Sequence, residues 1–300
     1  MTTSLCPFTM REAFLRKDDG LSGMKIGLST HIFANCSLTP RLIERIARQG
    51  FQTIELYANR PHFDFTNPAR IEEITQAIKR AGLRVSSIHA PFYSHISDAL
   101  KGRWLSICSV DERERREAVA LIKRALFICE KIEVRYLVVH FGNVNDGWDE
   151  GMVAQGTKSL QELEESCRPL GVSIAVENIV NQLSIPNHLA SLIKDSSLKG
   201  LGICLDIAHA HLTGSLPEGI EETASYILTT HLHDTSGDKD DHLIPFSGII
   251  DWKRVMDSFR AIGYEGPHIL EPRWSLLAGR NLRRAYYAAQ KIENLLLSRE

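Results

Sequence analysis

Residues 173–177, SIAVE, form a short apolar run that ends in an acid, Glu177, and the chain repeats this arrangement. Asp206 follows the run LGICL, His231 follows YILTT, and Glu271 follows HIL. If these runs are parallel strands, their carboxyl ends meet at one end of one sheet, so we expect the four side chains to lie together. Carboxylates and imidazoles are ligands of divalent metal ions. The pattern therefore predicts a metal site and, with it, an enzyme.

Around these runs the chain alternates short β-rich segments with segments of helical length. The candidate strands are KIGLS (25–29), TIELY (53–57), RVSSIH (84–89), YLVVH (136–140), SIAVE (173–177), LGICLD (201–206), ILTTHLH (227–233) and HILE (268–271). The candidate helices lie near residues 40–49, 69–81, 111–131, 151–170, 186–195, 216–226, 251–262 and 280–298. Such alternation predicts βα units and a parallel sheet.

Local signals mark several helix boundaries. Thr39-Pro40 and Asn67-Pro68 are placed to open two helices, and Gly50, Gly82, Gly171 and Gly263 are placed to close helices. Eight βα units predict an α/β protein with a single (β/α)8 TIM barrel domain over residues 24–300, whose active site gathers at the C-terminal ends of the strands. A doubly wound open sheet is the alternative, but it would not explain why polar residues end so many strands.

Composition limits the location and partners of the chain. The first 23 residues mix charges of both signs without a long apolar run, so we expect a flexible tail rather than a signal peptide, and Met24 is an alternative start. No apolar run is long enough to cross a membrane, and the six cysteines form no C-x-x-C pair, which predicts a cytoplasmic protein without a membrane partner. A formal charge of −2 gives no global basic field, so nucleic acid is not favoured, although a local basic groove stays open.

Further metal-ligating side chains end or follow other candidate strands. A single divalent ion needs about four protein ligands, so the larger set would serve two or three ions. His233 is an alternative to His231 as a ligand from the seventh strand. The additional side chains are His89, His140, His209, Asp240 and His242.

The order and spacing of these motifs resemble the xylose isomerase-like TIM barrels, the superfamily of AP endonuclease family 2 and of many sugar and sugar-phosphate isomerases and epimerases. The resemblance covers about residues 24–298. Its matching pieces are HAPF, VVHFGN, VEN, LDIAHAHLTG, HLHDTSGDKDDH followed by GIIDW, and LEPR.

In the isomerase and epimerase branch, the resemblance implies one metal ion held by Glu177, Asp206, His231 and Glu271. His231 is preferred to His233 because the ligand of the family lies three residues before an acid. Glu177 and Glu271 would also be the catalytic residues, which remove and return a proton next to a metal-chelated carbonyl. One base on each face gives epimerisation, and a single base acting on two adjacent carbons gives isomerisation.

In the endonuclease IV branch three zinc ions are held by nine ligands, and each ligand has a counterpart of the same type here. The chain departs from the endonuclease pattern at NIVNQLSIP after Glu177, at Ile207 and Ala208 between Asp206 and His209, and at HLHDTS. These departures favour the sugar branch. A zinc phosphodiesterase acting on abasic DNA or another phosphodiester is the alternative function, and a non-catalytic metal- or sugar-binding barrel is the second alternative.

The predicted partner is therefore a small sugar or sugar phosphate. His209 is expected to contact it or an additional metal ion, Arg273 to clamp a phosphate, and Trp274 to flank a sugar. Histidine-rich coordination favours zinc or manganese, with magnesium and cobalt as alternatives. Barrels of this superfamily often associate, so a homo-oligomer is also an expectation.

The sequence assigns no specific role to the residues near the ends of the first two strands or to the insertion after the third strand. The insertion FYSHISDALKGRW would stack on a base, hold a phosphate or cover a small sugar. His31, Glu55, Tyr57 and His62 lie near the ends of the first two strands, where pocket lining is expected.

Overall fold

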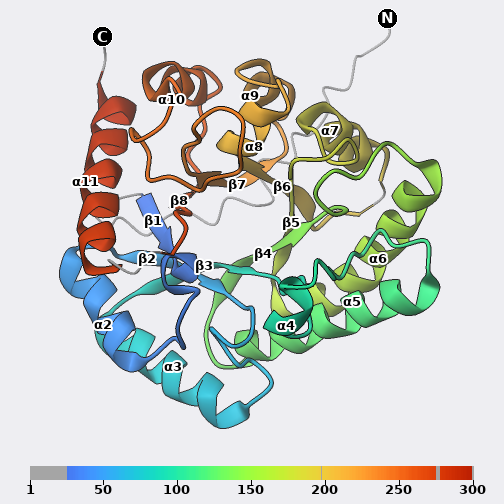
Figure 1. Cartoon of the computed structure of the whole chain (residues 1–300), viewed down its shortest axis with the longest axis horizontal. Coiled ribbons are helices and arrows are strands. Elements are labelled where there is room, and N and C mark those ends of the chain that lie inside the picture. The colour runs from blue at the N-terminus through green and yellow to red at the C-terminus, as the bar shows by residue number, and fades with distance from the viewer. Residues whose placement is uncertain (1–25, 197, 275–277, 299–300) are drawn as a thin grey trace, which may run out of the picture.

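The computed structural model of the chain describes residues 26–196, 198–274 and 278–298. The predicted tail (1–23) and the alternative start at Met24 lie outside the described residues. Within them, eight parallel strands close into one barrel in sequence order, and helices surround it (Figure 1). The predicted TIM barrel is confirmed, and the open sheet is excluded because β8 pairs with β1.

The strands agree closely with the expected ones. Four of the eight have the predicted bounds to the residue, and three others differ at one end. The first residue expected in the remaining strand, residue 25, lies outside the described residues. The strands are β1 (Ile26–Ser29), β2 (Thr53–Tyr57), β3 (Arg84–His89), β4 (Val134–His140), β5 (Ser173–Glu177), β6 (Leu201–Asp206), β7 (Ile227–Leu232) and β8 (His268–Leu270). His233 and Glu271 therefore lie just past the ends of their strands.

The larger helices follow the strands as expected, and among the described residues none is both long and apolar enough to cross a membrane. They are α2 (Pro40–Gln49), α3 (Pro68–Ala81), α5 (Glu112–Ala125), α6 (Glu150–Cys167), α7 (Pro186–Asp195), α10 (Trp252–Ala261) and α11 (Ala278–Leu297). Shorter helices and 3-10 turns are η1 (Thr30–Phe33), α4 (Ile96–Ala99), η2 (Leu126–Glu130), η3 (Arg168–Leu170), α8 (Ile207–Leu212) and α9 (Glu218–Glu222).

Three helix predictions need correction. The helix expected at 216–226 is only the five residues of α9, and those expected at 111–131 and 151–170 each end in a 3-10 turn. Pro169 explains the second break, because proline has no N–H to donate to the carbonyl four residues earlier. The unpredicted α8 begins directly after β6, where Oδ1 of Asp206 accepts the backbone N–H of His209 at 2.8 Å and so caps the helix.

The predicted boundary signals act as expected. Thr39 caps α2 by accepting the N–H of Leu42, and Asn67 caps α3. Gly50 and Gly82 follow these helices with φ of +117° and +68°, a left-handed conformation that glycine adopts without a side-chain clash.

The barrel interior changes from apolar to polar along the strands. Val138, Ala175 and Cys204 form a small buried cluster inside it. Successive side chains of a strand face opposite sides, so the residue two positions later faces inward again. On the same three strands those residues are His140, Glu177 and Asp206. The apolar cluster therefore forms a floor directly beneath the polar strand ends.

The main core lies between the barrel and its helices. Ile54, Leu137, Ile174 and Leu205 belong to it and are buried completely. Because both faces of each strand are covered, the strands read as nearly continuous apolar runs. This packing fixes the backbone from which the polar strand ends project.

Candidate metal centre

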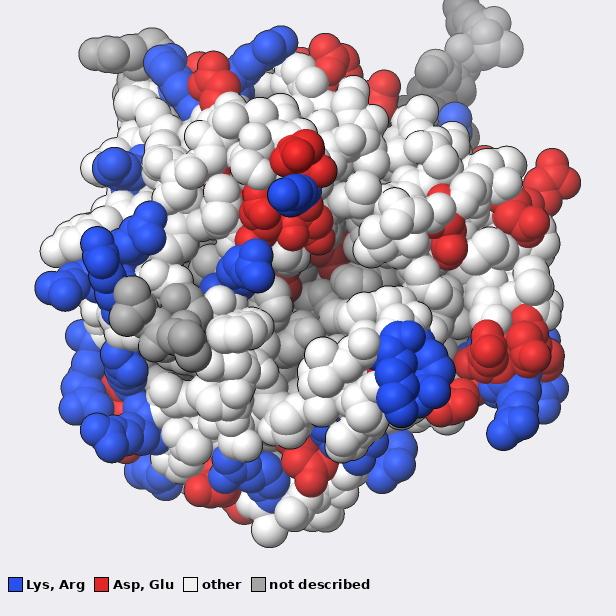
Figure 2. Space-filling view, viewed as in Figure 1, with Lys and Arg blue, Asp and Glu red and all other residues white. Residues whose placement is uncertain are grey.

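Four side chains meet at the C-terminal mouth of the barrel. One ligand atom from each of Glu177, Asp206, His231 and Glu271 lies within 4.8 Å of those of the other three, and none of the four residues is more than 2% exposed. Nδ1 of His231 lies 2.9 Å from Oε1 of Glu177 and 3.3 Å from Oε2 of Glu271. We call these four residues the strand group. On the face seen in Figure 2, acidic side chains gather beside a central hollow, with basic side chains among them.

A second set of donors adjoins the strand group through Glu177. Nε2 of His89 lies 3.3 Å and Nε2 of His140 lies 3.2 Å from Oε2 of Glu177. The opposite oxygen of the same carboxylate faces His231. Glu177 therefore lies between two sets of imidazoles, with one oxygen toward each.

A third set of donors comes largely from the loop after β7. His209, His233, Asp240 and His242 bring their ligand atoms within 4.8 Å of one another, and we call them the loop group. Nε2 of His209 lies 3.2 Å from Asp240, and Nε2 of His242 lies 3.4 Å from it. The structure thus brings together all the predicted ligand residues, and it adds His233 to the loop group.

His242 is held in place by backbone contacts. Its Nδ1 lies 2.9 Å from the carbonyl oxygen of Glu271, and its own carbonyl accepts the N–H of Arg273 at 2.9 Å. Its φ of +46° is in the left-handed region, which a non-glycine residue adopts only when its surroundings impose it.

Asn178 orients two members of the site. Its side chain accepts the N–H of Asp206 at 2.7 Å and donates to the carbonyl of the same residue at 2.9 Å. Its own carbonyl lies 2.9 Å from Nδ1 of His209, so Nε2 of His209 is the nitrogen that faces Asp240. Asn178 is part of the motif VEN, but nothing in the sequence indicates that its side chain binds the backbone of Asp206.

Glu55 of β2 and His31 of the turn η1 also reach the site. Nε2 of His231 lies 3.0 Å from Oε2 of Glu55, and His31 has a ligand atom close to those of His242 and Glu271. From the sequence we expected both residues to line the pocket, but we could assign neither of them a specific role. The roles depend on contacts across the barrel, which the spacing along the chain does not show.

The two predicted catalytic glutamates have opposite pKa shifts. Burial raises the pKa of Glu271 above its ordinary value, and the charge of Glu177 adds to this despite the nearby histidines. Burial would also raise the pKa of Glu177, but His231 and His140 outweigh it and hold that pKa well below its ordinary value. One carboxyl is thus suited to carry a proton and the other to remain ionised.

Two histidines of the loop group, His242 and His209, have raised pKa values and so hold their protons more strongly than usual. Burial lowers the pKa of His242, but the adjacent Asp240 outweighs it and raises the pKa to about 9. The pKa of His209 is raised well above its ordinary value, because Asp206 and Asp240 outweigh the effect of burial. A cation bound at these atoms would therefore have to displace protons.

Buried carboxylate oxygens of the site face imidazole nitrogens: Oε2 of Glu177 lies 3.2 Å from Nε2 of His140, and Oδ2 of Asp206 lies 3.0 Å from Nε2 of His233. A cation between such a carboxylate and a neutral imidazole would satisfy the acceptors of both. Oxygen and imidazole donors in this number suit a divalent ion. The residues present therefore fit a metal site.

The predicted substrate-binding residues that follow the last strand lie at the surface. Arg273 and Trp274 are both exposed, and Trp274 is 42% exposed. The insertion after β3 is tied back on itself, because the N–H of Leu105 donates to the carbonyl of Phe92 at 2.9 Å. The ring of Phe92 stacks on that of His140 with centroids 4.7 Å apart, so this insertion forms an aromatic wall beside the site.

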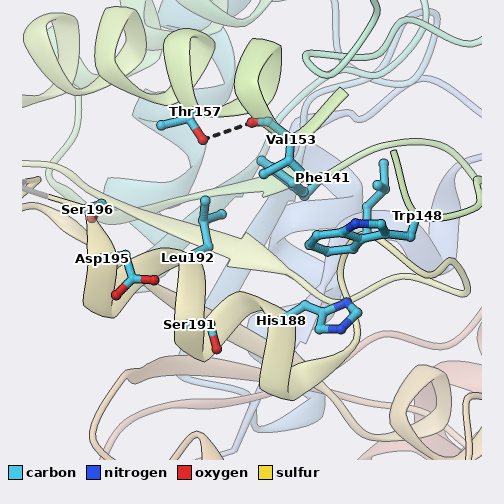
Figure 3. Close-up of a pocket in the computed structure, with 10 residues that line it drawn as sticks. Phe141, Trp148, Val153, Thr157, His188, Ser191, Leu192, Asp195 and Ser196 are labelled. Atoms are coloured by element: carbon cyan, nitrogen blue, oxygen red, sulfur yellow. Dashed lines mark hydrogen bonds between the residues drawn. The ribbon is translucent and has the colours of Figure 1, made fainter. Parts of the chain in front are cut away.

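A separate cavity of about 300 Å³ lies outside the barrel, between α6 and α7 (Figure 3). Trp148 and His188 lie at one end of it, with ring centroids 4.5 Å apart, and apolar side chains such as Leu192 line it. The ligand-type residues of the barrel mouth are not among those that line it. The cavity is therefore distinct from the metal centre.

A model of the family described as xylose isomerase-like TIM barrel matches residues 43–295. The chain belongs to this family. The family assignment agrees with the resemblance of the motifs and with the observed barrel.

Relatives of the chain include enzymes of two kinds. An uncharacterised protein of Methanocaldococcus jannaschii is 29% identical over 84% of the chain and 84% of its own length. A probable endonuclease 4 of Carboxydothermus hydrogenoformans is 24% identical over 60% of the chain and 62% of its own length. The crystal structure of a D-tagatose 3-epimerase-like protein is 25% identical, with a TM-score of 0.74 over 92% of the chain and 100% of that protein. Further relatives, at 20–25% identity, are sugar epimerases and an isomerase.

Proposed function

We propose that the protein is a metal-dependent isomerase or epimerase of a sugar or sugar phosphate, in which Glu177 and Glu271 transfer the proton. The observation that carries this proposal is the convergence of these two carboxylates, from β5 and from the end of β8, on one group of four donors. The sugar epimerases among its relatives support the same reaction class.

The four residues of the strand group would together hold a divalent ion, which would polarise the carbonyl of the substrate and stabilise the charge that develops on its oxygen. The two glutamates would also transfer the proton. Glu177, with its lowered pKa, is ionised and would take the proton from the carbon next to the carbonyl. Glu271, with its raised pKa, would return a proton.

The surroundings suit a small polar substrate. The aromatic wall that contains Phe92 would exclude water from one side of the site. His209 would hydrogen-bond a substrate hydroxyl, and the exposed Arg273 would pair with a phosphate. Manganese and zinc are the ions that this donor set favours.

Substitution of each glutamate tests the reaction. Turnover of candidate ketoses and sugar phosphates is measured with Glu177→Gln and Glu271→Gln, and each variant should lose about 10²–10⁴-fold in kcat. Asp234→Asn is the matched control, because Asp234 is an equally buried carboxylate that binds the indole N–H of Trp252 instead. If both glutamine variants kept full turnover, the two-carboxylate mechanism would be wrong.

A multinuclear phosphodiesterase is the second candidate. Its specific support is that Glu177 is shared between two sets of donors while the loop group forms a third. Clustered metal ions would together supply a nucleophile from water and neutralise the charge of a phosphoryl transition state. The probable endonuclease 4 among the relatives is consistent with this chemistry.

Metal stoichiometry separates the two candidates. Elemental mass spectrometry of protein purified without chelator is compared with a His89→Ala, His242→Ala double variant. About one ion per chain, unchanged in the variant, supports the isomerase or epimerase. Two or three ions that decrease in the variant would contradict it and favour phosphodiester hydrolysis, which is then assayed on DNA with abasic sites.

A further inference from the structure

Glu55 carries a carboxylate inside the barrel, one layer below the mouth. On β2 it pairs in register with Ser87, which precedes His89 by two residues on β3, and the pairing is irregular between Ile54 and Glu55. Glu55 is completely buried. A substrate held at the mouth would not reach it, so its carboxylate must act, if at all, through a neighbouring side chain.

That neighbour is His231. Oε2 of Glu55 accepts the hydroxyl of Ser87 at 2.8 Å and lies 3.0 Å from Nε2 of His231. The other ring nitrogen of His231, Nδ1, faces the carboxylates of Glu177 and Glu271 at 2.9 and 3.3 Å. The imidazole therefore lies between Glu55 below and the carboxylates of Glu177 and Glu271 above.

This arrangement decides which nitrogen can bind a cation. An imidazole binds a metal through a nitrogen that carries no proton, and a carboxylate at the other nitrogen keeps the proton there and fixes the ring. We propose that Glu55 is a positioning residue that holds His231 by its Nε2–H, so that Nδ1 is the atom which His231 presents to a divalent cation.

Stability alone does not account for a carboxylate at this position. A buried charge pays a desolvation penalty that a well-packed apolar side chain avoids. The other nearby group is the thiol of Cys204, which also lies within hydrogen-bond reach of His231. A thiol is a weak acceptor, so Glu55 is the stronger partner for the imidazole.

The affinity for Zn²⁺ alone tests this role. Dissociation constants of the full chain are measured by competition with a chelator for the unmodified protein, Glu55→Gln and Asp234→Asn. Glu55→Gln should weaken binding about 10- to 100-fold, whereas Asp234→Asn, which removes an equally buried charge without contact to His231, should leave it nearly unchanged. Equal affinity of Glu55→Gln and the unmodified protein would overturn the proposal, and so would an equal loss in the control.

Two further readouts exclude a merely structural role. In a His231→Ala background, Glu55→Gln should cause little additional loss of affinity, because its effect passes through the imidazole; additive losses would overturn the proposal. In protein loaded with ¹¹³Cd²⁺ and labelled with ¹⁵N-histidine, the metal should couple to Nδ1 of His231. Coupling to Nε2 would show that Glu55 does not hold that nitrogen.

The inference rests on the metal site of the proposed function but not on its reaction. All three measurements are made without substrate. Tight Zn²⁺ binding without turnover of any sugar would reject the proposed reaction and leave the role of Glu55 intact, whereas sugar turnover with unchanged affinity in Glu55→Gln would reject only that role. If the unmodified protein bound no divalent ion, both would fail.

Discussion

The strand group and the loop group contain the same kinds of side chain but are held in different ways. The four residues of the strand group are buried at the ends of packed strands. In the loop group, the side chain of Asp240 is 33% exposed and that of His242 is 18% exposed. Their loop is held by local contacts, such as the pairing of Asp234 with Leu243, and by the contacts of His242 with the segment that follows β8.

This difference bears on what each group is suited to do. Strand ends hold their side chains rigidly, because the sheet and the surrounding helices fix the backbone. A loop adjusts more easily and is open to solvent. We therefore expect the strand group to hold the ion that is essential for the reaction, and the loop group to modulate binding of substrate or of a further ion.

The largest expected effect comes from comparing the two glutamates of the strand group. Glu177→Gln should remove a ligand shared by two sets of donors, whereas Glu271→Gln should leave the His89 and His140 set intact. Both should lower kcat about 10²–10⁴-fold, and Glu177→Gln should also lower the bound metal more. Metal content and kcat are measured on the same samples. Equal metal content in the two variants would contradict a bridging role of Glu177.

A smaller effect is expected in the loop group. Asp240→Asn removes the carboxylate that faces His209 and His242, and it should lower activity about 10- to 100-fold while the ion of the strand group is retained. The neighbouring Asp241→Asn is the matched control, because its carboxylate binds Ser236 instead. Loss of all bound metal in Asp240→Asn would show that the two groups do not act separately.

The strand group was the part of the site that the sequence predicted best. A run such as SIAVE identifies both a strand and the side chain at its end, so the barrel topology alone brings Glu177 and Asp206 together. His233 belongs to the loop group, and Glu55 contacts His231, because of the stagger between strands that are far apart in the chain. Periodicity does not carry that information, which explains why their roles had to come from the structure.

The loop group should also respond to pH in a way that can be measured. The pKa of His242 is raised to about 9 by Asp240, so its protonation stabilises the metal-free protein below about pH 6.5, and this contribution is lost as the pH rises through about 9. A cation needs the neutral ring, so a further ion at the loop group, which the phosphodiesterase alternative requires, would bind more strongly over the same interval and release protons. Calorimetry of Zn²⁺ binding in two buffers of different ionisation enthalpy measures the release. His242→Ala should reduce it, and an unchanged value would contradict the assignment.

The smallest expected effect concerns substrate rather than metal. Arg273 follows the strand group residue Glu271 by two positions, yet its side chain is exposed and its N–H bonds the carbonyl of His242, so it belongs to the open side of the site. An ion pair of an exposed side chain contributes about 0.2–1 kcal/mol, so Arg273→Ala should raise KM for a phosphorylated sugar about 2- to 5-fold. KM for the same sugar without phosphate, and the metal content, should not change, because neither depends on the guanidinium. An equal rise in KM for both sugars would mean that Arg273 supports the loop rather than the phosphate.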